Sequence, residues 1–160
     1  REKVFHPRSR KAGKLERAAL RTSKLATQTS VRSKQQTAKV DRAGFFYLAL
    51  PPDVPSLTLE ELHELVSSVW ITRHNEAIKA EESRRRKGEP RRPREVALRE
   101  QQLRDVEEYR TGLELPDLTD ESTVALFRQW GGVDTSYLHL LRTIRISSSN
   151  TKMVQVVKCG

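Results

Sequence analysis

The chain has 160 residues, of which 36% are hydrophobic and 32% are charged. This length and composition predict one modest hydrophobic core with extensions, and they disfavour a large enclosed active site. The 30 Lys and Arg against 21 Asp and Glu give a net charge of +9, which favours a polyanionic partner. The longest apolar run, Ala43 to Pro52, is too short to span a bilayer, and the charged N-terminus lacks a signal-peptide core, so we expect a soluble protein without membrane contact.

The positive charge is concentrated in residues 1–42, which carry 13 basic and three acidic side chains. The rest of the chain carries 17 basic and 18 acidic side chains and is therefore close to neutral. Cations that neutralise phosphates release the counterions condensed on a nucleic acid, which drives association. We therefore predict that residues 1–42 form a nucleic-acid-binding arm.

The arm is predicted to be one helix, because Ser9 can cap it after His6-Pro7 and no proline follows up to Arg42. On a helical wheel eight of its basic residues share a sector about 80° wide. They are Arg10, Lys14, Arg17, Arg21, Lys24, Arg32, Lys39 and Arg42. A solvated surface helix would normally mix Glu with Lys, whereas Glu16 is the only acid between Glu2 and Asp41. The pattern therefore favours phosphate binding.

A second face of the arm is apolar and can pack on another surface; it consists of Leu15, Ala18, Ala19, Leu25 and Ala26. This face ends at Ala26, where Thr, Ser and Gln take over. Helix formation from Thr27 to Lys39 is therefore expected to depend on a bound partner.

Three further helices are predicted after an aromatic segment, Gly44 to Leu50, which suits a helix end or a short extended segment. Thr58 and Glu61 form a capping box, and Gly88 should stop that helix. The next runs from Pro93 to Gly112, and Thr119 or Asp120 caps the last, which Gly131-Gly132 closes. The residues expected to face inward are Leu59, Leu62, Leu65, Val66, Val69, Trp70 and Ala77 in the first, Val96, Leu103, Val106 and Tyr109 in the second, and Val124, Leu126, Phe127 and Trp130 in the third.

The sequence thus predicts an all-α fold in three parts. Residues 1–42 form the basic RNA-binding arm, residues 43–146 a small helical domain with a basic hinge at 84–94, and residues 147–160 an extended tail with a short strand at Met153–Val157. Residues 137–146 suit either a helix or an extended exit.

Catalytic chemistry has little support in the sequence. His63 and His74 share a helix face but are eleven residues apart, whereas zinc ligands on one helix are typically three or four apart, so packed or half-exposed histidines are expected. No phosphate loop, dinucleotide turn, nucleophile elbow or HExxH pair occurs. The single cysteine, Cys159, allows no internal disulfide, which fits a reducing compartment. We expect a non-enzyme with no cofactor and no metal.

The hinge carries a second cluster of basic residues: Arg84, Arg85, Arg86, Lys87, Arg91, Arg92 and Arg94. This cluster is a candidate nuclear-import signal or second RNA contact. The alternative is a solvated loop, because Glu81, Glu82, Glu89 and Glu95 dilute its charge.

RNA is favoured over DNA as the partner of the arm. A basic helix of the zipper type needs a leucine heptad directly after it, and none follows. A stripe of Lys and Arg suits phosphate contacts rather than base reading, and folded RNA crowds phosphates around deep grooves. A basic DNA- or chromatin-binding module remains the main alternative, and a nucleic-acid-modifying enzyme ranks third.

The N-terminal residues also resemble a known family. The segment Lys3 to Ala12, KVFHPRSRKA, with the later Leu15, Arg17, Leu20, Arg21 and Lys24 and with Arg42 before Phe45-Phe46, resembles the translation machinery-associated protein 16 family of eukaryotes. The order of the helices, with Trp70 and Trp130, is similar in arrangement.

The resemblance implies a non-enzymatic assembly factor on late nuclear precursors of the large (60S) ribosomal subunit, which leaves before translation. Its implied partners are ribosomal RNA, including 5S and large-subunit RNA near the stalk base, with large-subunit ribosomal proteins and assembly factors. The implied location is the nucleus and nucleolus, with passage to the cytoplasm on particles. The resemblance places His6, Pro7, Ser9, Arg10 and Lys11 at the RNA-facing start of the arm.

Together these observations predict a factor that acts by steric occupancy and by positioning RNA. The candidate RNA-binding residues are His6, Arg8, Ser9, Arg10, Lys11, Lys14, Arg17, Arg21, Lys24, Arg32, Lys39 and Arg42.

Overall fold

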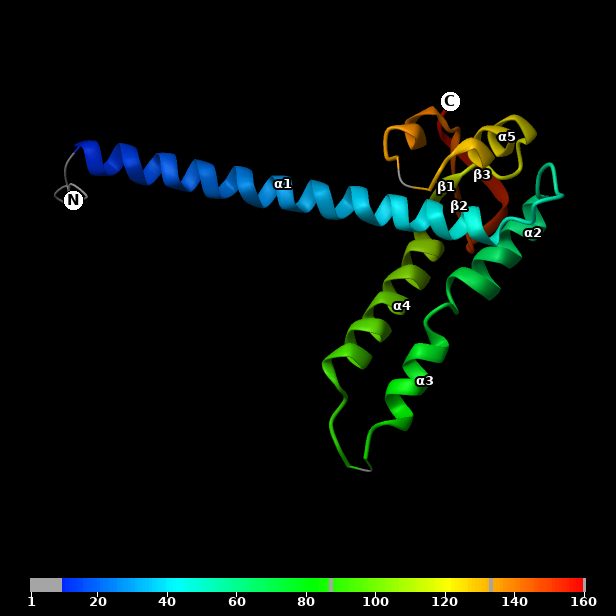
Figure 1. Cartoon of the computed structure of the whole chain (residues 1–160), viewed down its shortest axis with the longest axis horizontal. Coiled ribbons are helices and arrows are strands. Elements are labelled where there is room, and N and C mark those ends of the chain that lie inside the picture. The colour runs from blue at the N-terminus through cyan, green and yellow to red at the C-terminus, as the bar shows by residue number, and fades with distance from the viewer. Residues whose placement is uncertain (1–9, 87, 133, 160) are drawn as a thin grey trace. The chain divides into compact units, whose positions relative to one another are not determined.

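The structure, a computed structural model, describes residues 10–86, 88–132 and 134–159 and divides into two compact units, Arg1–Asp41 and Arg42–Gly160. The second unit combines helices with an antiparallel sheet in the order β1-β2-β3 (Figure 1). The predicted all-α fold is therefore wrong: the chain is mostly helical but belongs to the mixed α and β class.

Helix α1 spans Arg10–Ala49, and its last turns belong to the second unit. The aromatic segment after Arg42 thus continues the helix, which ends just before Pro51-Pro52. The reason is the spacing of Ala43, Phe46 and Leu50, which puts three buried side chains on one helical face. Packing of that face stabilises the helical conformation there.

The capping box is confirmed: the Thr58 side chain accepts from the Glu61 backbone N–H, and the Glu61 carboxylate accepts from the Thr58 backbone N–H. The single predicted helix is, however, broken into α2 (Leu59–Glu64), the π-helix η1 (Leu65–Trp70), a turn and α3 (Asn75–Ser83). Ser68 and Thr72 hydroxyls donate to backbone carbonyls four residues earlier. Such bonds compete with the backbone ladder and favour local departures from the α-helix.

Helix α4 (Pro93–Thr111) has the predicted limits, with Pro93 in its first turn and Gly112 after its end. Gly112 has φ 145°, and a Cβ there would lie 2.6 Å from Cδ of Arg145, so only glycine fits. The predicted inward face is wrong apart from Tyr109: the three aliphatic side chains Val96, Leu103 and Val106 are exposed. Helix α4 instead buries the carboxylates of Glu95 and Asp105, both bound to arginines.

Helix α5 (Glu121–Gln129) begins at Asp120, whose carboxylate accepts the Thr123 backbone N–H. Hydrogen bonds from Ser122 and Thr123 lower the pKa of Asp120 to about 2. Val124, Phe127 and Trp130 are buried as predicted, whereas Leu126 is exposed. The 3₁₀-helix η2 (Tyr137–Leu140) follows.

The sheet consists of β1 (Leu113–Pro116), β2 (Thr143–Ser147) and β3 (Asn150–Lys158). The pairs Leu113–Ile146 and Leu115–Ile144 bury one face, since alternate residues of a strand point the same way. The predicted extended tail is therefore corrected: residues 150–158 form an edge strand with exposed side chains throughout, longer than the predicted Met153–Val157.

Aromatic side chains hold the end of α1 inside the second unit. Phe46 stacks on Trp70 with ring centroids 5.5 Å apart, and Phe45 meets Trp70 edge to face. On the other side Tyr47 packs edge to face against Phe127 and Trp130, which stack on each other. Such pairs contribute about 0.5–1.5 kcal/mol each beyond area burial, so α1 joins η1 to α5 through this cluster.

The buried cluster predicts a sharp contrast between two positions of α1. Phe46 is 0% exposed and Leu48 is 84% exposed. Phe46→Ala should lower the free energy of unfolding by about 3–5 kcal/mol through lost packing and a cavity. Leu48→Ala, the control on the same helix, should change it by less than about 0.5 kcal/mol. Urea unfolding followed by tryptophan fluorescence measures both, and equal losses would contradict the packing of α1.

Candidate nucleic-acid interface

The basic stripe of the arm lies on the N-terminal part of α1, in the first unit. Its members before Arg42 are all exposed; they are Arg10, Lys14, Arg17, Arg21, Lys24, Arg32 and Lys39. Lys11, also a candidate, is exposed as well, whereas His6, Arg8 and Ser9 lie outside the described residues. Glu16 and Asp41 are the only acids between residues 10 and 41. The described arm thus presents a row of cations with little opposing charge.

Side-chain hydrogen bonds to the backbone recur along the helix that carries the stripe. The hydroxyls of Thr22, Thr27, Thr29 and Thr37 each donate to the carbonyl four residues earlier. Arg17 Nε donates to the Gly13 carbonyl at 3.0 Å. Leu20 and Leu25 are exposed on the same helix. The arm is therefore a helix whose stripe is accessible along its described length.

Arg42, the last predicted member of the stripe, has a different environment in the second unit. Its Nη2 lies 2.6 Å from Glu108 Oε2, and its Nη1 donates to the Glu114 carbonyl at 3.1 Å. Its guanidinium also lies 5.8 Å from the centre of the Trp70 ring. These contacts tie α1 to α4 and β1, so Arg42 serves the packing of this unit.

Trp70 lies against a second arginine as well. The Arg73 guanidinium carbon is 3.5 Å from the Trp70 ring centre, and Arg73 Nη2 is 2.6 Å from Asp105 Oδ2. Asp105 is buried and also accepts a hydrogen bond from Gln101. A cation over an indole face is attracted by the ring quadrupole, and a buried carboxylate needs a cation. Arg73 therefore joins the turn after η1 to α4.

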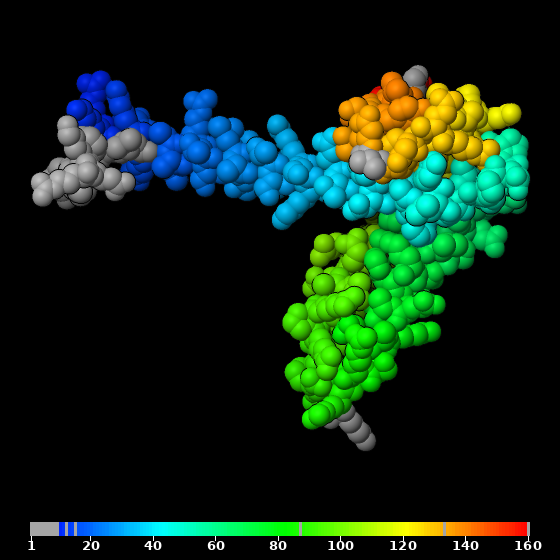
Figure 2. Space-filling view, viewed as in Figure 1, coloured from blue at the N-terminus to red at the C-terminus, as the bar shows by residue number. Residues whose placement is uncertain are grey.

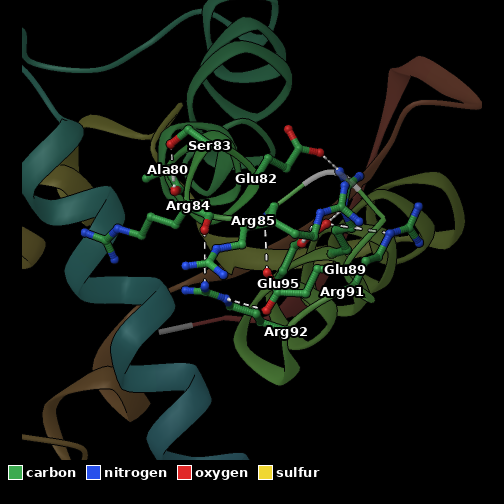
Figure 3. A network of polar contacts seen from close by, with 11 residues as sticks. Ala80, Glu82, Ser83, Arg84, Arg85, Glu89, Arg91, Arg92 and Glu95 are labelled. Carbon is green, nitrogen blue, oxygen red and sulfur yellow. Dashed lines mark hydrogen bonds and ion pairs between the residues drawn. The ribbon is translucent and has the colours of Figure 1, made fainter.

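The predicted hinge is the connection between α3 and α4, which pack side by side as a helical hairpin (Figures 1 and 2). Figure 3 shows the carboxylates of Glu89 and Glu95 among Arg85, Arg91 and Arg92 of this connection. Glu95 lies 3.9 Å from Arg85 and 3.6 Å from Arg91, and Arg92 lies 3.9 Å from Glu89. Arg84 and Arg94 both pair with Glu81. Ion pairs thus order most of the predicted second contact.

Two members of that second cluster, Arg86 and Lys87, are not among these ion-paired arginines. Arg86 has an exposed side chain, and its backbone N–H donates to Glu89 at 3.0 Å. Lys87 lies outside the described residues. Sequence reasoning did not identify Arg99, which binds Glu82 and Glu95 from one turn further along α4. The signal that could have identified it is its position four residues after Glu95 on a predicted helix.

The two candidate histidines are packed rather than paired with each other. His63 is buried with Nδ1 2.7 Å from the Tyr109 hydroxyl, and burial lowers the pKa of His63 and raises that of Tyr109. Burial is also the main cause that lowers the pKa of His74, followed by the charge of Arg73. No group of three or more potential metal ligands occurs in residues 10–86, 88–132 and 134–159. No helix in those ranges is long and apolar enough to cross a bilayer.

A family model described as translation machinery-associated protein 16 matches residues 1–148. The chain belongs to this family. Proteins of that name from Saccharomyces cerevisiae and Xenopus laevis are each 28% identical to it, over 96% and 94% of the chain and 86% and 78% of their own lengths. The relative from Danio rerio is 24% identical over 94% of the chain and 79% of its own length. The resemblance seen in the first 45 residues is confirmed, and the match reaches into the sheet.

The arginines of this family member divide into those that hold the fold and those that are accessible, which predicts different costs of removal. Arg73→Ala leaves the buried Asp105 carboxylate without its cation and should lower the free energy of unfolding by about 3–5 kcal/mol. Arg104→Ala removes an exposed ion pair with Glu100 on α4, the helix that carries Asp105, and should lower the free energy of unfolding by less than about 1 kcal/mol. Urea unfolding checks both, and a similar small loss for each would refute the structural role of Arg73.

Proposed function

We propose that this chain is a ribosome assembly factor that binds ribosomal RNA on nuclear precursors of the large subunit. The family's name associates its members with the translation machinery, which supports a ribosome-related role. The proposal goes further than this name, because the arm has the exposed row of cations expected of a helix that binds an RNA phosphate backbone.

The exposed stripe of the arm is the observation that carries the proposal. Seven cations between Arg10 and Lys39 recur on one helix face and are accessible, with Glu16 as the one acid among them. A regular row of Lys and Arg matches the repeating charge of a phosphate backbone and carries no base-specific pattern. Folded RNA is favoured over duplex DNA, because sequence reading in the DNA major groove needs side chains that match base edges.

The mechanism we propose is occupancy. The arm neutralises RNA phosphates and covers the surface on which it lies, so RNA elements are held in place and later components are excluded until it leaves. The second unit contributes contacts to ribosomal proteins and assembly factors. Release then requires only that the RNA surface changes or that a competitor takes the same phosphates.

We propose no catalytic step. The histidine best placed by burial, His63, is hydrogen-bonded to Tyr109, and the buried carboxylates of Glu95 and Asp105 are paired with arginines. These groups are used within the fold. Incubation of the purified chain with large-subunit RNA and Mg²⁺ should leave the RNA intact, and metal-dependent cleavage that co-purifies with the chain would refute a binding role alone.

The nucleus and nucleolus are the proposed location, with the factor bound to precursor particles. In a sucrose gradient of nuclear extract the protein should migrate with large-subunit precursors and move to the light fractions when salt is raised. Salt-resistant retention on chromatin would favour the DNA-binding alternative instead.

The stripe gives a quantitative prediction. Replacing Arg17, Arg21 and Lys24 together by Gln should weaken binding to folded RNA and reduce the slope of log affinity against log salt by about 0.7–0.9 per lost contact, or roughly 2–3 in all. Fluorescence anisotropy over a salt series measures the slope. The matched control is Arg104, Arg110 and Lys152 to Gln, which removes the same charge and residue types from exposed positions of the second unit. Equal slopes for both variants would exclude phosphate contacts by the arm.

A further inference from the structure

We propose that the end of the α3–α4 hairpin is a second RNA site, in which buried glutamates hold arginine side chains ready to bind phosphates. This hairpin tip comprises Glu81, Glu82, Arg84, Arg85, Glu89, Arg91, Arg92, Arg94, Glu95 and Arg99. Figure 3 shows the part of the tip around Glu89 and Glu95. The inference rests on the proposed function, because it assigns a second contact with the same polymer.

Two buried carboxylates organise the tip. Glu95 is 0% exposed, and Arg85, Arg91 and Arg99 surround it at 3.9, 3.6 and 3.2 Å. Glu81 is also buried and pairs with Arg84 at 3.5 Å and Arg94 at 3.7 Å. One well-placed cation compensates one buried carboxylate. Five arginines on two glutamates therefore exceed what the stability of the hairpin requires.

The arginines remain accessible although they are held. The exposed fractions of the Arg84, Arg91 and Arg94 side chains are 64%, 59% and 73%. A guanidinium presents five N–H donors in a rigid fork, and a carboxylate uses only one edge of it. These exposed fractions leave much of each side chain accessible to a ligand. Because the side chains are already oriented, less rotamer freedom is lost when an anion binds.

The tip also keeps an excess of positive charge. Its six arginines face four glutamates, and the exposed Arg86 adds another cation beside them. The rest of α4 is different: Arg104 pairs with Glu100 and Arg110 with Glu107, each cation with one exposed carboxylate. Positive charge without matching acid is thus a property of the tip and not of the whole helix.

RNA phosphate is the ligand that this chemistry fits best. Arginine outnumbers lysine at the tip, and its planar fork matches two phosphate oxygens in a way that a point charge cannot. An acidic peptide would offer similar oxygens, but the chain already carries an RNA-binding arm in the proposed function. Two sites on one polymer raise the effective concentration of the second contact, so even a weak tip adds to affinity.

A pair of isosteric variants distinguishes positioning of the arginines by Glu95 from the effect of net charge alone. Glu95→Gln and Glu100→Gln each remove one negative charge from α4, so charge alone predicts equal or tighter RNA binding for both. If Glu95 positions the arginines, Glu95→Gln should instead bind folded RNA about 3- to 10-fold more weakly, while Glu100→Gln is unchanged or tighter. Anisotropy titrations with the full chain, after circular dichroism shows both variants folded at the assay temperature, measure this. Tighter binding by both variants would overturn the positioning role.

A second pair keeps the test independent of Glu95. Arg84→Gln with Arg94→Gln should reduce the salt slope by about 1.4–1.8, and the charge-matched Arg104→Gln with Arg110→Gln should leave it unchanged. Equal salt slopes for the two double variants would overturn the tip as an RNA site. If the Arg84/Arg94 variant keeps the salt slope of RNA binding but loses binding to polyglutamate, the tip is instead a site for an acidic protein. The arm triple variant reports separately on the proposed function, since its slope can change while that of the tip pair does not.

Discussion

The ion pair between Arg73 and the buried Asp105 is the contact on which much of the second unit depends. A carboxylate at 2% exposure is tolerated only beside a cation, so α4 must keep this face toward the turn that carries Arg73. Arg73 in turn lies on Trp70, and Trp70 stacks on Phe46 at the end of α1. One electrostatic requirement therefore fixes the rotation of α4 and, through an indole ring, the position of α1 within this unit.

Helix limits were predictable because local chemistry sets them. The capping box at Thr58, the proline at the start of α4 and the glycine after its end act within a few residues, and the structure confirms them. The buried face of α4 was not predictable in this way. Its aliphatic residues suggested an inward stripe, yet its partner α3 offers glutamate and asparagine and the turn before α3 offers Arg73, so the polar face became the buried one.

The sheet was missed for a different reason. Strand β1 has four residues and ends in a proline, so it has too little alternation to be distinguished from a loop. Its stability comes from pairing with β2, about thirty residues away in sequence, and this pairing supplies the partners for Leu113 and Leu115. Strand β3 has no buried side chain and depends on its backbone bonds to β2. Long-range pairing of this kind leaves little trace in a local pattern.

The candidate site shows which part of electrostatics a sequence reveals. The arm stripe can be recognised from residue spacing alone, because few acidic residues interrupt it. In the second unit spacing is insufficient: Arg42 continues the stripe by count but contacts Glu108, while Arg84 and Arg94 come together only through Glu81.

The two basic regions therefore differ in physical kind. The exposed cations of the arm stripe suit a long phosphate backbone whose exact path varies, whereas arginines held on buried glutamates suit phosphates in one arrangement. The proposed function would use both kinds, the first to reach an RNA surface and the second to hold one register on it.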